Sequence, residues 1–77
     1  MVQAIILITA EPGRDRSVAA KVKALAEVKQ VYLVSGLYDV AAEIQAADAA
    51  GVLALVYDKI RAIEDIRETQ TMFCLKV

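Results

Sequence analysis

Histidine is absent from this chain of 77 residues, which also lacks tryptophan and contains one cysteine and one proline. Most metal sites, general acid–base sites and nucleophilic triads use an imidazole. The composition therefore excludes Ser-His relays and histidine-ligated zinc or haem, and it predicts no metal, no cofactor and no enzymatic activity. Cys74 has no partner for an internal disulfide, which fits a reducing cytoplasm. Its apolar, alternating surroundings predict a small core or interface residue.

Long hydrophobic runs are also missing. Apolar stretches such as residues 4–8 are far shorter than the roughly 20 residues that a membrane helix needs. No cationic segment precedes an apolar one at the start of the chain, so no signal peptide is expected. Nine basic and ten acidic residues give a net charge of −1, which provides no electrostatic footprint for nucleic acid.

Hydrophobic residues, in contrast, are abundant. They make up 58% of the chain, and the mean hydropathy is +0.49. Residues 1–77 suffice for one small domain, whose core cannot absorb all of this apolar material. The excess predicts a surface that associates with another copy of the chain.

Hydrophobic periodicity predicts four strands and two helices in the order β-α-β-β-α-β. Strands are expected at residues 2–9, 28–35, 40–46 and 66–77, one helix from Asp15 to about Glu27, and a second helix with Asp48 as N-cap. This order is the split βαβ arrangement, in which right-handed crossovers place both helices on one face of the sheet. We therefore expect an α+β, ferredoxin-like fold with a four-stranded antiparallel sheet.

The uncovered face of this sheet predicts a dimer. The first strand carries Ile6 and Ile8 on one side and Ile5 and Leu7 on the other. Two helices can cover only one side, and soluble monomers rarely leave a large apolar face exposed. Face-to-face packing of two sheets, with isologous symmetry, is the expected solution.

The segment Gly36-Leu37-Tyr38-Asp39 lies between two strands and is the first candidate site. Glycine allows a ligand to approach the backbone, Tyr38 offers a flat wall with a hydroxyl, and Asp39 is able to accept from an ammonium group. These groups suit a free amino acid. A plain hairpin turn explains the same residues, and both interpretations stay open.

Thr69-Gln70-Thr71 is the second candidate, because alternate threonines place two hydroxyls on one face of a strand. Threonine is also simply a favoured strand residue. The third and fourth strands flank the first, so the segments near Asp39 and Thr69 are expected at the same end of the sheet. The carboxylates of Glu64, Asp65 and Glu68 lie among arginines and predict a solvated, partly paired turn.

Three segments together resemble a known family. They are residues 6–9 followed by Glu11-Pro12-Gly13, the stretch 31–39 and the stretch 63–71. In this order the chain resembles the C-terminal effector domain (RAM domain) of the Lrp/AsnC feast/famine transcriptional regulators. The resemblance implies dimers that assemble into rings, commonly octamers, with an amino acid bound between dimers by residues 35–39 and 69–71. Ser35 stands where a threonine is common, and Leu37 is bulkier than usual.

Family members usually carry an N-terminal helix-turn-helix, and nothing before Val2 supplies one. The expectation is a stand-alone module that acts through its assembly, with full-length Lrp/AsnC-type regulators as possible partners. Two alternatives share this strand order. One is a small dimeric enzyme of the monooxygenase or isomerase type, and the other is an ACT-type sensor, whose sheets join side by side.

Overall fold

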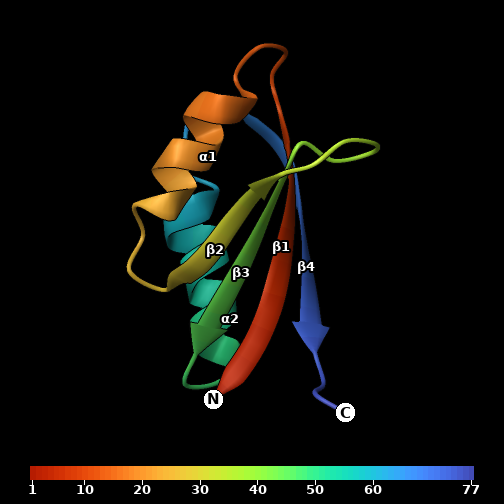
Figure 1. Cartoon of the computed structure of the whole chain (residues 1–77). Helices are drawn as coiled ribbons and strands as arrows, with labels where there is room; N and C mark the ends of the chain where they lie inside the picture. Colours follow the sequence, from red (N-terminus) through yellow and green to blue (C-terminus); the bar gives the residue numbers. More distant parts are fainter.

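An antiparallel sheet with strand order β2-β3-β1-β4 forms the frame of the structure, a computed structural model that describes residues 1–77. The strands are β1 (Val2–Ala10), β2 (Val28–Leu33), β3 (Val40–Ala46) and β4 (Ile66–Cys74); the helices are α1 (Asp15–Lys23) and α2 (Ala49–Leu55), the latter continued by a π-helix, η1 (Val56–Ile60). Both helices lie on the same face of the sheet (Figure 1). The predicted ferredoxin-like α+β fold is confirmed.

The core lies between the helices and one face of the sheet. Its thirteen residues are all hydrophobic and come from every element except β2 and β4: Ala4, Ile6, Ile8, Ala10, Val18, Val22, Val40, Ala42, Ile44, Val52, Leu55, Val56 and Ile60. Alternate residues of β1 and β3 point into this layer because successive strand side chains face opposite sides. The central strands are therefore anchored by packing, whereas the two edge strands contribute only half-buried residues such as Val31 and Ile66.

Strand β1 ends one residue beyond the predicted Thr9, and three other predicted boundaries are wrong by two residues or more, each for a local reason. Helix α1 ends at Lys23 and not near Glu27, because tight turns follow in which Leu25 N–H donates to Val22 O and Val28 N–H to Leu25 O. Strand β2 ends at Leu33 and not at residue 35, where the hairpin loop begins. Strand β4 ends at Cys74 and not at residue 77, because Cys74 already pairs with Gln3 near the start of β1.

Helix α2 begins as predicted. The Asp48 carboxylate accepts a hydrogen bond from the backbone N–H of Gly51 at 2.7 Å and caps the first turn. At the other end, Lys59 of η1 forms an ion pair of 3.1 Å with Glu27, in the turn before β2. Hydrogen bonds from the Glu27 backbone and then from Lys59 lower the pKa of the Glu27 carboxyl. No helix of this structure is long and apolar enough to cross a bilayer.

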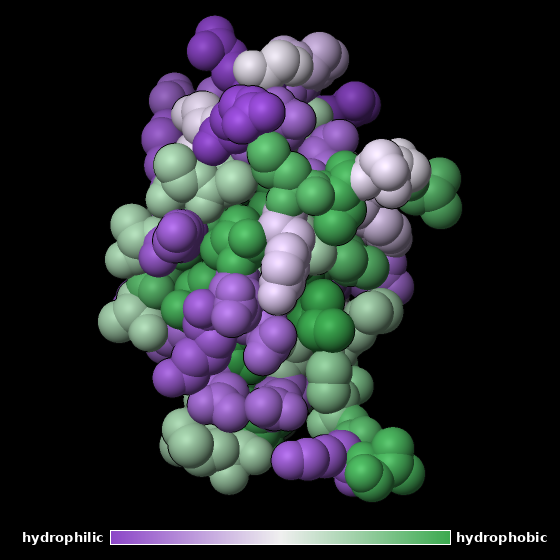
Figure 2. All heavy atoms as spheres, in the orientation of Figure 1, coloured by the Kyte–Doolittle hydropathy of each residue, from purple (hydrophilic) through white to green (hydrophobic).

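The open face of the sheet is less uniformly apolar than expected. The cross-strand pairs place a diagonal apolar band on it, comprising Met72, Ile5, Leu7, Ala41 and Tyr32. Glutamine and glutamate side chains border this band, and Figure 2 shows hydrophobic and hydrophilic residues mixed over the strands. Cys74 lies at the margin of the same face and is exposed, which excludes the core position that was one of its two predicted roles and leaves the predicted interface position open.

Ile6→Ala is expected to lower the free energy of unfolding by about 2–5 kcal/mol, because it leaves a cavity beneath both helices. Leu75→Ala, at a side chain that is 89% exposed, is the control and should change stability by less than about 0.5 kcal/mol. Urea denaturation measures both. Equal losses for the two variants would contradict the assignment of the core.

Candidate functional site

The two candidate segments meet in the structure. The loop of residues 34–39 between β2 and β3 projects beyond the sheet and passes the beginning of β4 (Figure 1). The Tyr38 hydroxyl donates a hydrogen bond to Oε1 of Gln70, a residue 32 positions later in the sequence. The expectation that both segments lie at the same end of the sheet is therefore correct.

A solvent-open hollow of about 420 Å³ lies at this junction. It is lined by Thr9, Leu37, Tyr38, Glu68, Thr69 and Gln70. Four of these six residues were singled out from the sequence. Thr9 and Glu68 were missed as site residues, because they enter the hollow through the β1–β4 pairing, in which they stand opposite one another. A sequence signal that points to them is their spacing: Thr9 lies two positions after Leu7 and Glu68 two positions before Gln70, so each shares a face of the sheet with that neighbour.

The other predicted site residues lie outside the hollow. Ser35 and Gly36 are exposed in the loop, where Gly36 has a φ of +118°, a conformation that L side chains rarely adopt. Thr71 pairs with the buried Ile6 and so faces the helix side of the sheet. Thr69 lies on that same side by its pairing with Ile8, yet it reaches the rim of the hollow.

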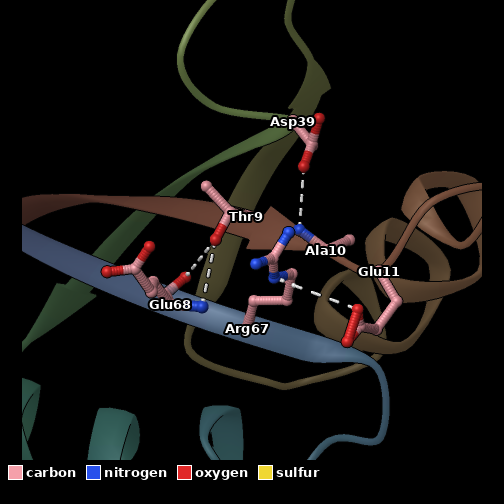
Figure 3. A network of polar contacts seen from close by, with 6 residues as sticks. All are labelled: Thr9, Ala10, Glu11, Asp39, Arg67 and Glu68. Carbon is pink, nitrogen blue, oxygen red and sulfur yellow. Dashed lines mark hydrogen bonds and ion pairs between the residues drawn. The ribbon is translucent and has the colours of Figure 1, made fainter.

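Asp39 has a structural role that the sequence did not reveal. Its Oδ2 accepts a hydrogen bond from the Ala10 backbone N–H at 2.8 Å (Figure 3). Its own N–H donates to Ile8 O, and its carbonyl accepts from Val34 N–H, both at 2.9 Å. The β1–β3 pairing ends at Ile8 and Val40, so no backbone carbonyl of β3 is left to accept a hydrogen bond from the N–H of the buried Ala10. The Asp39 carboxylate accepts this hydrogen bond in place of a strand carbonyl.

A bulge in β4 lies beside this contact. Thr9 pairs with Glu68 and Ala10 with Ile66, so Arg67 has no partner residue in β1. The Thr9 hydroxyl accepts from the Glu68 N–H at 3.0 Å and holds the strands together next to the bulge. Arg67 turns toward Glu11, whose carboxylate lies 3.9 Å from its Nε (Figure 3). The carboxylates of Glu64 and Glu68 are exposed as predicted, but neither they nor Asp65 form an ion pair, so the predicted pairing with the neighbouring arginines is wrong.

Comparison with known proteins supplies the identity of the domain. Residues 3–77 match the family described as the Lrp/AsnC ligand binding domain. The chain belongs to this family. The resemblance stated from residues 6–9, 31–39 and 63–71 is confirmed.

Relatives of this Lrp/AsnC domain are transcriptional regulators. It is 33% identical to the uncharacterized HTH-type regulator YugG of Bacillus subtilis, an alignment that covers 97% of this chain and 47% of YugG. The chain thus spans about half the length of the curated relatives that it matches. Among solved structures, FFRP-DM1 is 33% identical with a TM-score of 0.91, over 97% of this chain and 100% of that one. NMB0573 of Neisseria meningitidis, solved as an L-Met complex, has the same fold at 23% identity, with a TM-score of 0.86 over 97% of this chain and 50% of that one.

A second concavity of this Lrp/AsnC domain opens on the helix side of β4. It is a groove of about 620 Å³ between α2, η1 and the first half of β4, and four of its nine lining residues are hydrophobic. The guanidinium of Arg61 lies 4.9 Å from the ring centre of Tyr57 at its rim. Thr69 and Glu68 line both concavities, so the two are neighbours on opposite sides of one strand.

Asp39→Ala is expected to lower the free energy of unfolding by about 1–3 kcal/mol, because it leaves the Ala10 N–H without an acceptor. Asp39→Asn retains a side-chain oxygen that can accept this bond and should lose clearly less. Urea denaturation measures stability, and hydrogen exchange at the Ala10 amide reports the contact directly. An Asp39→Ala protein with unchanged stability and unchanged exchange would rule out the anchoring role.

Proposed function

We propose that this domain is a regulatory module that binds a free amino acid in the hollow between the 34–39 loop and β4, and that it is not an enzyme. The observation that carries this proposal is the contact between Tyr38 and Gln70, which joins two candidate segments around one open concavity. Membership of a ligand-binding family supports it.

The hollow contains the groups that a zwitterion needs. The Gln70 side-chain amide and the Thr69 hydroxyl at the rim are able to donate to a ligand carboxylate, and the Glu68 carboxylate with the Tyr38 hydroxyl oxygen is able to accept from an ammonium group. Leu37 provides an apolar contact for the ligand side chain. Because the Asp39 carboxylate is engaged with Ala10, we assign the ammonium to Glu68 and give Ser35, Gly36 and Asp39 the role of shaping the loop.

A second subunit is proposed to complete the site. The hollow is open to solvent, and Leu37 at its rim is 90% exposed. Figure 2 shows a hydrophobic tip on the projecting loop. The apolar band of the open sheet face supports a dimer, and contacts through the loop would join dimers into larger rings. Such contacts would close the hollow over its ligand.

Regulation is proposed to act through this assembly. A ligand shifts an assembly equilibrium only by its differential affinity for the two states, and such couplings are typically about 1–3 kcal/mol. The curated relatives are transcriptional regulators about twice as long as this chain. We therefore propose a cytoplasmic module that co-assembles with a full-length Lrp/AsnC-type regulator.

A thermal-shift screen of the twenty amino acids should identify a stabilising ligand, with L-methionine tested first. A ligand at 100 times its dissociation constant adds about 2.7 kcal/mol of stability. Tyr38→Phe and Gln70→Ala should each weaken the response, because they remove polar groups of the hollow without touching the core. Tyr32→Phe, on the open face, is the matched control. Unaltered responses in both site variants would refute the placement of the ligand.

Sedimentation velocity should show a dimer or a larger assembly of the unmodified protein. Ile5→Asp, in the centre of the apolar band, should reduce the assembly to subunits, because a carboxylate cannot be buried there without a partner. Lys21→Asp, on the exposed surface of α1, is the control and should sediment as the unmodified protein does. A well-folded lone subunit before any substitution would end the proposal of an intersubunit site.

A further inference from the structure

The outer edge of β4 is unpaired. The strand order β2-β3-β1-β4 places β4 at one margin of the sheet, where it pairs with β1 alone. Alternate residues of an antiparallel strand direct their N–H and C=O groups to opposite sides, so half of these groups in β4 point away from β1. No backbone hydrogen bond of the chain reaches them. Helix α2 makes few contacts with β4, and Figure 1 shows no helix over its outer side. A row of donors and acceptors therefore faces solvent.

The opposite edge of the sheet carries features that prevent strand pairing. Strand β2 is six residues long, and its register shifts between Val28 and Gln30. The exposed Lys29 lies within this irregularity. Short strands, bulges and lysine side chains are devices by which natural proteins protect a sheet edge. The start of β4 is protected in a similar way, because the bulge at Arg67 and the charge of Glu68 lie there.

Residues 69–73 of β4, the uncharged edge, have no such protection. Their sequence Thr-Gln-Thr-Met-Phe contains no charge, proline or glycine, and its threonine and phenylalanine residues favour a strand. Met72 and Phe73 are 40% and 49% exposed. The Cys74 thiol makes one weak contact with this backbone, at 3.8 Å from Met72 O. An unprotected edge of this kind is a template for a further strand.

We propose that the uncharged edge pairs, antiparallel, with the same edge of a second copy of the chain. A two-fold axis beside Thr71 then gives the pairs Thr71 with the partner's Thr71, Gln70 with the partner's Met72 and Thr69 with the partner's Phe73. Opposite residues of an antiparallel pair share a face, so the helix side of one sheet continues into that of the other. No charge is buried by this pairing, and threonines that face one another across strands stabilise it.

The edge contact adds to the dimer proposed above and rests on that proposal. Two strands that pair over so short a stretch are only marginally stable by themselves in water. A dimer built by face-to-face packing carries two β4 edges, one from each sheet, and each edge is available to a further dimer. Two isologous contacts that alternate in this way close into a ring where the rotation permits, and otherwise form an open chain.

The same contact brings a second copy to the amino-acid hollow. Thr69 and Gln70 of the uncharged edge also line the hollow. Pairing at the edge places Phe73 and Met72 of the partner subunit against these two residues. The second copy thus contributes side chains to the wall of the hollow, which links assembly at the edge to occupancy of the site.

Thr71→Lys tests the edge contact, because the two-fold axis places the two new ammonium groups opposite each other. In sedimentation velocity the unmodified protein should form an assembly larger than a dimer, and Thr71→Lys should stop at the dimer. Ser17→Lys, at an exposed hydroxyl residue of α1, adds the same charge and should sediment as the unmodified protein does. A Thr71→Lys protein that keeps the larger assembly would overturn the proposal. An unmodified protein that stops at the dimer overturns the edge contact alone, whereas a lone subunit also ends the proposed intersubunit site.

Hydrogen exchange, read at each amide by NMR, tests the contact without a substitution in β4. In the paired edge every amide of residues 69–73 is bonded either to β1 or to the second copy, so all five should exchange slowly in the unmodified assembly. In the subunits produced by Ile5→Asp, alternate amides of this stretch should lose their protection. This measurement decides the question even where Thr71→Lys fails to fold. Rapid exchange of alternate amides in an assembly larger than a dimer would show that another surface joins the dimers, and would refute pairing at the edge.

Discussion

The two helices of this chain pack over three strands of the sheet, and the strand they leave largely uncovered is β4. The helices pack over β2, β3 and β1, so β4 is held mainly by its hydrogen bonds to β1 and by Ile66 at its start. Polar side chains are tolerated on both faces of β4 because neither face is covered by a helix, so they remain in contact with water. The two concavities described above consequently lie along β4, one on each side of the strand.

The offset between strand pairs has a second consequence. Strand β1 runs two residues further with β4 than with β3, which leaves the Ala10 N–H without a backbone partner. The Asp39 carboxylate fills this position and, with its own backbone bonds, attaches the end of the 34–39 loop to the central strand. Tyr38 is therefore adjacent to a fixed residue, and its hydroxyl is held near β4 before any ligand arrives. Such preorganisation reduces the entropy that binding must overcome.

Local signals predicted the elements well and the site only in part. Alternation gave the bounds of β3 correctly, and Asp48 caps α2 as its position indicated. The ends of α1 and β4 were missed because tight turns after Lys23 and the lack of a pairing partner beyond Cys74 are tertiary facts. Thr9 and Glu68 are 59 residues apart and were not associated from sequence, since only strand register brings them together.

Composition and periodicity by themselves determined the fold class, the number of predicted helices and strands and the absence of imidazole chemistry, and the resemblance of three sequence segments indicated the family. These properties follow from burial along short stretches of chain, which a local pattern records. The tertiary structure alone decided that Asp39 supports the sheet, that Thr69 and Thr71 face the helix side, and that Arg67 turns toward Glu11. Those outcomes depend on the register of the strand pairs and on the bulge in β4. A shift of one residue in strand pairing would move each side chain to the opposite face of the sheet.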